Sequence, residues 1–419
     1  MPHTEGAESR GNVADTGKTD QDAVLRARVL LLGVEHLGTW ERVLAYRVLA
    51  RVSPRAYLPL LVDALLERGY ELDDREVRVR LFAEAADEAL RMDGDVSEAR
   101  VGRALGAWER ALFAAGRRAE GRAVCEELAG SGAYGRLAKV LAEEGRHAEA
   151  AGLLGRHLGQ EGTDASEWEL IEWAAELDAA GRREEALELF ARLVAGRRSE
   201  AAAGRAPLAS LVWLVVQHAG MLRAAGRVAG AAAARQEALT VLTRLARDGE
   251  PVSWSNIQAW WVTLFLLSGR PEEPAATPAA PMPPFGAHVV HGWSPDAREG
   301  YLASVPSLER EVAALRGSGD LPALIAVHRR LVLRRALRWE TSGRRAAETL
   351  LPCFDEGVAL ARGLPDGHPV LARALTDRAM FLLAVKRYAE ARRDLAEAVV
   401  LQGGSARPVS PMSHPTSEE

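Results

Sequence analysis

The sequence predicts an all-α protein in which pairs of helices stack as a repeat array. One phrase, a helix-like run followed by Gly-Arg and an Ala-rich run, recurs at Gly116, Gly145, Gly181, Gly226 and Gly269. Self-similarity at intervals of a few tens of residues is typical of stacked-repeat architectures. The chain is also 48% hydrophobic with only 5% aromatic residues, and a core rich in Ala, Leu and Val suits closely packed helices.

Composition and periodicity divide the 419 residues into six expected segments. Prolines repeat through 271–284, where they forbid helix and favour an extended, semi-rigid linker. In chain order the segments are a disordered tail (1–21), a helical cap or separate helical module (22–94), a repeat array (95–270), the Pro-rich linker (271–284), a second helical block (285–402) and a disordered tail (403–419). Within the second block, Ser294-Pro295 is expected to start a short helix.

Each copy of the phrase places apolar residues on one helical face. In the third copy these are Leu170, Trp173, Ala174 and Leu177 before Gly181, and Ala186, Phe190 and Leu193 after it. Their spacing of three to four residues is that of an amphipathic helix. The last copy, HPVLARALTDRAMFLLAVKRYAEARRDLAEAVVL, carries Lys386 where the others carry glycine.

This pattern resembles the tetratricopeptide repeat of bacterial, actinobacterial-like proteins, a helix-turn-helix unit with a small residue in each helix. The resemblance implies a helical solenoid in two blocks, with a concave groove in which peptides or partner helices dock. Two copies depart from the repeat, because Gly121 stands where Ala is expected and Arg235 where a bulky apolar residue is expected. The registers that hold Asn in chaperone-binding relatives carry Ala175, Gly220 and Met380, which argues against binding of chaperone tails.

The resemblance also indicates a candidate partner-binding groove. Trp168 and Trp213 occupy the same register in consecutive copies, and the family places this register on the groove. The candidate groove residues are Trp168, Glu172, Asp178, Trp213, Gln217 and Arg223. Tryptophan and arginine often carry interface energy, but burial of both tryptophans between helices is the competing interpretation.

A second candidate surface is the helix that carries Trp254, Trp260 and Trp261. This helix lacks its repeat partner, so its apolar face must be covered by something. The C-terminal block and a partner protein are the two possible covers.

Several motifs suggest chemistry but lack its structural context. Residues 130–135 match a dinucleotide-binding G-x-G-x-x-G, yet a helix rather than a strand is expected before them. Gly17-Lys18-Thr19 matches only the end of a P-loop, and His288 and His291 lack further metal ligands at suitable spacing. The sequence therefore predicts no enzyme, no cofactor and no metal site.

The bulk properties limit the partners and the compartment. A net charge of −5 argues against a nucleic-acid binder. The two cysteines, Cys125 and Cys353, are expected to be free buried thiols. No signal peptide or membrane-spanning stretch is found in the sequence, so a soluble, cytoplasmic protein is expected.

The predicted function is that of a non-catalytic scaffold or adaptor that binds a protein or peptide in its groove. The alternative is a peptide-sensing regulatory protein whose effector module is 22–94, where Arg42, Arg47, Arg51 and Arg55 form a basic stripe. The identity of the partner and the oligomeric state do not follow from the sequence.

Overall fold

A computed structural model describes residues 21–33, 37–92, 96–130, 134–159, 165–253, 256–339 and 345–403. In these ranges the chain is built from α-helices, with one 3-10 turn and one isolated β-bridge and no strand, which confirms the all-α prediction. Cys125 and Cys353 are both buried thiols that form no disulfide within the described residues, as expected. None of the described helices is both long and apolar enough to cross a membrane. The predicted tails lie almost wholly outside the described residues.

The chain forms two compact units, 1–128 and 129–419. The boundary therefore falls inside the stretch 95–270 that the sequence analysis treats as one array, and the Pro-rich segment 271–284 does not separate two units. The first unit contains α1 (Gln21–Gly33), α2 (Thr39–Val52), α3 (Pro54–Glu71), α4 (Arg75–Leu90), α5 (Val96–Ala114) and most of α6 (Arg118–Gly130).

In the first unit each helix from α1 to α5 packs against the next along the chain. Gly69 allows the close approach of α3 and α4, because a Cβ there would lie 2.1 Å from the ring of Phe82. The basic stripe expected here is partly neutralised. Arg42 pairs with Glu67 at 2.6 Å, and Arg47 binds both carboxylate oxygens of Glu84.

The second unit also consists of helices that pack in neighbouring pairs. They are α7 (Tyr134–Glu143), α8 (His147–Leu158), α9 (Glu167–Ala179), α10 (Arg183–Ala202), α11 (Leu208–Ala224), α12 (Val228–Asp248), α13 (Ile257–Gly269), the 3-10 turn η1 (Arg270–Glu272), α14 (Pro295–Ala303), α15 (Val305–Ser318), α16 (Leu321–Trp339), α17 (Arg345–Arg362), α18 (His368–Ala384) and α19 (Tyr388–Leu401). The start of α14 at Pro295, directly after Ser294, confirms the expected helix start.

The Gly-Arg turns join the helices of a pair by one recurring hydrogen-bond pattern. At the second of them Gly145 has φ +79°, in the left-handed region that favours glycine. The amide of Arg146 then donates to the carbonyl of Leu141 at 2.8 Å, and its guanidinium binds Glu149 at both oxygens. The same backbone bond recurs after Gly116, Gly181, Gly226 and Lys386.

The fifth Gly-Arg phrase does not form this turn. Gly269 has φ −88° and ends α13, and the chain continues directly into η1. A Cβ on Gly269 would lie 2.4 Å from the side chain of Leu333 on α16. This glycine is needed for close packing of two helices rather than for a turn.

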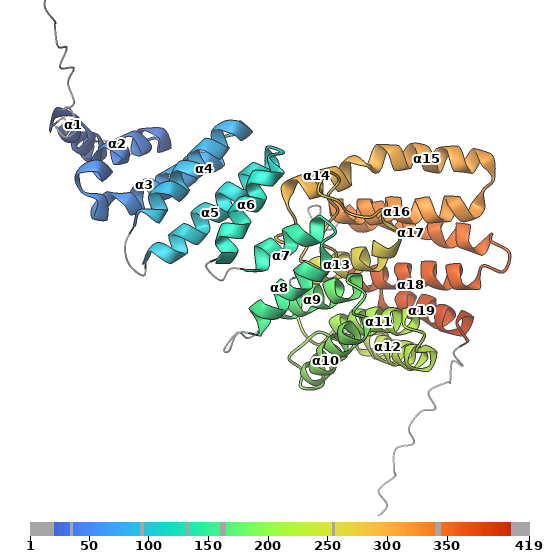
Figure 1. Ribbon diagram of the computed structural model, residues 1–419. Helices are drawn as coiled ribbons and strands as arrows, with labels where there is room; N and C mark the ends of the chain where they lie inside the picture. The colour runs from blue at the N-terminus through green and yellow to red at the C-terminus, as the bar shows by residue number, and fades with distance from the viewer. Residues whose placement is uncertain are drawn as a thin grey trace, which may run out of the picture. The chain divides into compact units, whose positions relative to one another are not determined.

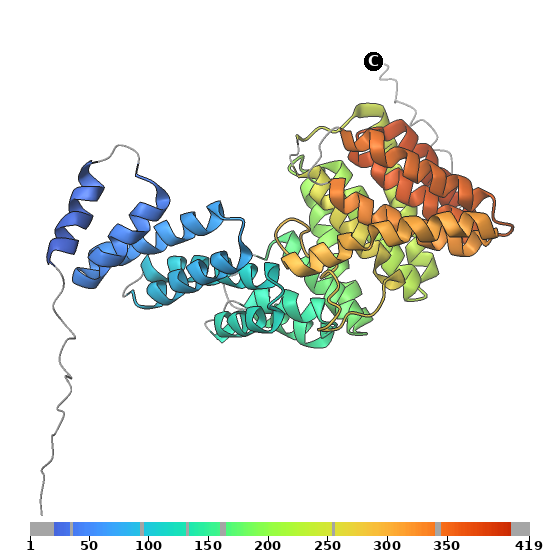
Figure 2. The same cartoon turned by 90° about the horizontal axis from the view of Figure 1, so that it is seen from above.

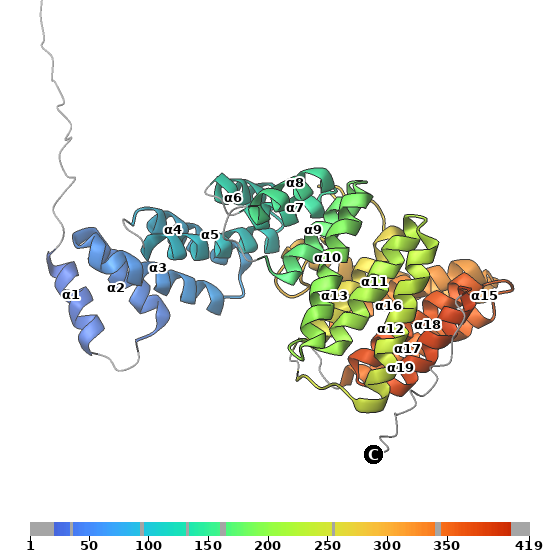
Figure 3. The ribbon, with the colours of Figure 1, turned by 90° about the horizontal axis from the view of Figure 1, so that it is seen from below.

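The order of helices in space departs from the order along the chain after α12. The C-terminal helices α15 to α19 pack in sequence on one another, and α19 packs against α12 (Figure 3). The C-terminal helices α15 to α19 therefore contact the end of the preceding series of helices, α12, through the last helix of the chain, α19. Figure 2 shows these C-terminal helices, coloured orange to red, as one block beside the green helices of the same unit.

The helix α13 lies in the interior of the second unit (Figure 1), where it packs against α11, α16 and α18. Aromatic rings fix this position. Trp261 stacks on Phe265 with ring centroids 5.4 Å apart and contacts Phe381 of α18 at 5.3 Å. Phe381 in turn stacks on Phe354 of α17 at 4.8 Å.

The segment 273–294, called the strap below, runs along α7 and α9. The amide of Met282 donates to the carbonyl of Glu143 at 3.0 Å. The carboxylate of Glu143 accepts from the amide and the hydroxyl of Ser294 at 2.7 and 2.6 Å. Phe285 and Val289 are buried. The strap is thus part of the packed unit, in contrast to the extended linker that its prolines suggest.

Candidate functional site

The strap and α13 cover the part of the predicted groove that carries Trp168. The ring of Trp168 lies 4.6 Å from that of Trp260 and 4.4 Å from that of His288. Beside it, Gly286 of the strap fits because Ala175 is small, and a Cβ on Gly286 would lie 2.7 Å from that of Ala175. At this position the chain itself occupies the place where a partner was expected.

The acidic groove residues are also engaged within the chain. Glu172 is buried and forms an ion pair with Lys139, with 3.1 Å between its Oε2 and the lysine Nζ. Burial raises the pKa of Glu172, and the charge of Lys139 only partly opposes this effect. Asp178 binds the guanidinium of Arg270 at 2.7 Å.

Trp213 is largely buried between helices, although it also lines the cleft described below. Its side chain is 2% exposed, and its indole nitrogen donates to the carbonyl of Met380 at 3.2 Å. Burial between helices, the competing interpretation, describes nearly all of this side chain.

The tryptophan helix is buried as well. Trp260 and Trp261 are 4% and 1% exposed, so neither lies on an exposed apolar face. Of the two possible covers, the C-terminal block is the one found, because α16 and α18 pack against α13. Trp254 lies outside the described residues.

The remaining motifs have structural roles where they are described. His288 and His291 stack at 5.2 Å, and no group of three metal-ligating side chains occurs in the described ranges. The dinucleotide-like motif begins at the end of α6, so a helix precedes it as expected. Its residues 131–133, like Gly17-Lys18-Thr19, lie outside the described residues.

Four of the six predicted groove residues, Asp178, Trp213, Gln217 and Arg223, line a cleft of about 770 Å³ within the second unit. Its walls come mainly from α11, α13, α16, α17 and α18, with Asp178 of α9, Arg270 and Pro271 of η1 and single side chains from α12 and α19. Trp261, Phe265 and Phe354 give it an aromatic floor. Pockets of ~300–1,000 Å³ with mainly apolar walls are typical ligand sites.

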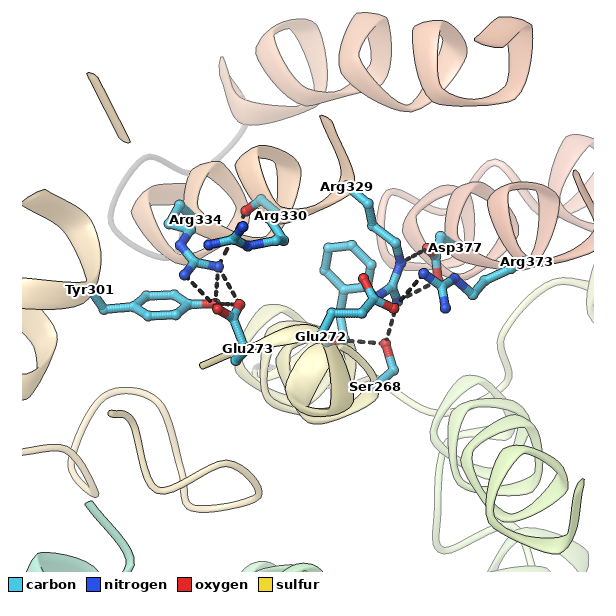
Figure 4. Close-up of polar contacts among 10 residues, drawn as sticks. Ser268, Glu272, Glu273, Tyr301, Arg329, Arg330, Arg334, Arg373 and Asp377 are labelled. Atoms are coloured by element: carbon cyan, nitrogen blue, oxygen red, sulfur yellow. Dashed lines mark hydrogen bonds and ion pairs between the residues drawn. The ribbon is translucent and has the colours of Figure 1, made fainter. Parts of the chain in front are cut away.

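A buried polar cluster borders the cleft at the end of α13 (Figure 4). Arg329 binds Asp377 at 2.7 Å, both oxygens of Glu272 at 3.1 Å and the hydroxyl of Ser268 at 2.9 Å. Burial lowers the pKa of Arg329, but Asp377 and Glu272 outweigh it and raise the pKa overall. Arg373 also pairs with Glu272.

The adjacent glutamate completes this cluster on the other side of the turn. Figure 4 shows Glu273 turned toward Arg334 and Tyr301, and Glu272 toward Arg329. Glu273 forms a two-point ion pair with Arg334, whose guanidinium lies 3.9 Å from the centre of the Tyr301 ring. These bonds hold the end of α13 against α14 and α16 and so fix one wall of the cleft.

Two arginines of the cleft lack such a partner. Arg223 of α11 and Arg235 of α12 both line it, and neither forms an ion pair or hydrogen bond through its side chain with any residue the structure describes. Burial lowers the pKa of Arg235, and the charge of Arg223 lowers it further. Arg235 is half-buried, whereas Arg223 is exposed.

His328 of α16 lines the same cleft and is 4% exposed. Its Nε2 lies 3.3 Å from Glu356, which also pairs with Arg316. Burial lowers the pKa of His328 more than Glu356 raises it. The imidazole is therefore neutral at pH 7.

The sequence carried two signals for this cleft that point away from the repeat pattern. Arg235 replaces a bulky apolar residue, and Gly220 replaces a larger groove residue. Both line the cleft, where Gly220 leaves open space because a Cβ there would meet no atom within 4 Å. The wall formed by α16 to α18 carries no comparable local signal.

Comparison of the chain with known protein families gives no match, and no curated protein sequence is significantly similar to it.

Proposed function

We propose that this chain is a non-catalytic adaptor that binds a peptide segment of a partner protein in the cleft of its second unit. The observation that carries this proposal is the cleft itself, about 770 Å³ with an aromatic floor and polar groups at its walls. Its volume suits a peptide of a few residues or a ligand of similar size. The helix pairs and their left-handed turns are compatible with a tetratricopeptide-like array, which binds peptides in other proteins.

The cleft is favoured over the predicted groove because it is the part that the chain leaves open. The strap and α13 already contact Trp168, and Trp213 is in the core. Of the four predicted groove residues that line the cleft, Gln217 and Arg223 form no side-chain hydrogen bond or ion pair with the described residues and remain available to a ligand.

The regulatory alternative, with 22–94 as an effector module, gains less support. Its basic stripe would have to face nucleic acid, but Glu67 and Glu84 neutralise Arg42 and Arg47. The function that we test is therefore peptide binding without catalysis.

Selection of random displayed peptides on the full-length protein tests this proposal. Gly220→Trp fills the cleft from α11. Gly196→Trp is the matched control, because Gly196 is also helical, equally open at Cβ and outside the cleft. Selected peptides are expected to bind the wild type and Gly196→Trp equally and Gly220→Trp at least about tenfold more weakly. Equal binding to all three proteins would overturn the proposed site.

A further inference from the structure

The charges that line the cleft do not balance. Asp178 and Asp377 are neutralised by Arg270 and Arg329 at 2.7 Å each. Among the described residues this leaves Arg223 and Arg235 as cleft arginines without a carboxylate partner. Arg235 is half-buried and Arg223 is exposed. An anion bound by both offsets the partial burial of the Arg235 charge and the repulsion between the two arginines.

We infer that Arg223 and Arg235 form a subsite for one anionic group, so that the ligand of the cleft is an apolar peptide segment that carries a carboxylate. Arginine suits this role because its planar guanidinium binds carboxylates through two parallel hydrogen bonds. The two residues lie on successive helices, α11 and α12, and both line the cleft. The inference rests on the proposed function, because it describes the same cleft.

A second polar group in the wall points to a ligand with hydrogen-bond donors. Oε1 of Gln402 is buried, lines the cleft region and has no hydrogen-bond partner in the described chain. A buried acceptor without a donor costs free energy. A backbone N–H of a peptide bound in the cleft supplies that donor, whereas a hydrocarbon does not.

Two fluorescent probes with the same apolar body separate the anion subsite from the cleft. The anionic probe is 1-anilinonaphthalene-8-sulfonate, whose sulfonate replaces the carboxylate, and the neutral probe is N-phenyl-1-naphthylamine. Both are titrated into the full-length wild type, the double variant Arg223→Gln/Arg235→Gln and Gly220→Trp. The control Arg244→Gln removes an exposed arginine of the same helix α12 that does not line the cleft.

The double variant is expected to bind the anionic probe about tenfold or more weakly, and the neutral probe as tightly as the wild type does. Added salt is expected to weaken only the anionic probe, because it screens the arginine charges. Arg244→Gln is expected to bind both probes like the wild type, and Gly220→Trp to lose both. Unchanged neutral binding also shows that the double variant is folded.

The outcomes distinguish this inference from the proposed function. If the double variant keeps its affinity for the anionic probe while Gly220→Trp loses both probes, the anion subsite is wrong and the cleft stands. If the wild type binds neither probe, or if Gly220→Trp binds both unchanged, the cleft itself is not a binding site and both proposals fail.

Discussion

Single residues in this protein show how one residue type takes different roles in successive helix pairs. Trp168 is half-buried beside His288 of the strap, whereas Trp213 is 2% exposed and donates to Met380. The sequence places both in one register, but the register only defines a face of a helix. What covers that face is decided by segments distant along the chain.

Trp213→Ala is expected to destabilise the protein by about 3–5 kcal/mol, because it removes a large side chain from the core. Thermal unfolding followed by circular dichroism measures the effect. Trp213→Phe keeps most of the volume and should cost less. A melting temperature unchanged by Trp213→Ala would show that this side chain is exposed in the groove rather than buried.

Arg235→Gln is expected to leave the melting temperature unchanged or to raise it. Burial and the charge of Arg223 both lower the pKa of Arg235, so the folded state disfavours its charged form at pH 7. Removal of that charge removes the free-energy cost of holding it in the folded state. The same change removes a contact to the ligand, and such opposite effects on stability and function are common. A clear loss of thermal stability would mean that Arg235 has a stabilising partner instead.

At the scale of elements, the helix pairs are predictable because their turns are local. At Gly145 and Gly181 the sequence shows a glycine, the arginine that follows it and a glutamate three residues after the arginine. In the structure the glycine lies in the left-handed region, the arginine amide donates to a leucine carbonyl, and the arginine side chain binds the glutamate. The strap is not predictable for the opposite reason. Its prolines exclude helix, but the distant residues Arg136 and Glu143 hold it against α7.

Two glycines with open space at Cβ should respond to alanine with opposite signs. Gly181 has φ +80°, so Gly181→Ala should cost about 1–2 kcal/mol. Gly196 lies inside α10, and Gly196→Ala should stabilise by about 0.4–1 kcal/mol. Lys386, a non-glycine residue at φ +63°, offers the reverse test, because Lys386→Gly should relieve strain. Melting temperatures that move in one direction for both alanine variants would contradict this account of the turns.

At the scale of the whole molecule, the arrangement could be predicted only in part. The sequence predicts paired helices and two helical runs, and the structure bears out the helical pairs. The packing of α19 on α12 and the burial of α13 depend on contacts between residues more than a hundred positions apart, such as that between Trp261 and Phe381. The cleft arises from these contacts, so only its local deviations, Gly220 and Arg235, were visible in advance.

Buried and half-buried histidines should make the stability of the second unit fall in mild acid. Burial lowers the pKa of His218, His288 and His328 in the folded state. Below the ordinary histidine pKa of about 6.5, the unfolded chain therefore binds protons that the folded chain does not, and stability is lost as pH falls. The melting temperature of the wild type should drop more between neutral and mildly acidic pH than that of His328→Gln.

The comparison within this pair isolates His328 from other titrating groups. Glu172 acts in the opposite direction, because its raised pKa favours the folded state as pH falls. Glu172 is present in both proteins, so its contribution cancels when the two pH profiles are compared. Parallel pH profiles for wild type and His328→Gln would show that this histidine is not held neutral by burial.

The central claim is that a peptide binds in the cleft rather than in the groove that carries Trp168. Hydrogen–deuterium exchange of the full-length protein, with and without a displayed peptide selected on it, tests this claim without choosing a site in advance. Slower exchange is expected in α11 and α16–α18, which wall the cleft. Protection confined to α7, α9 and the strap, or to helices of the first unit, would contradict it.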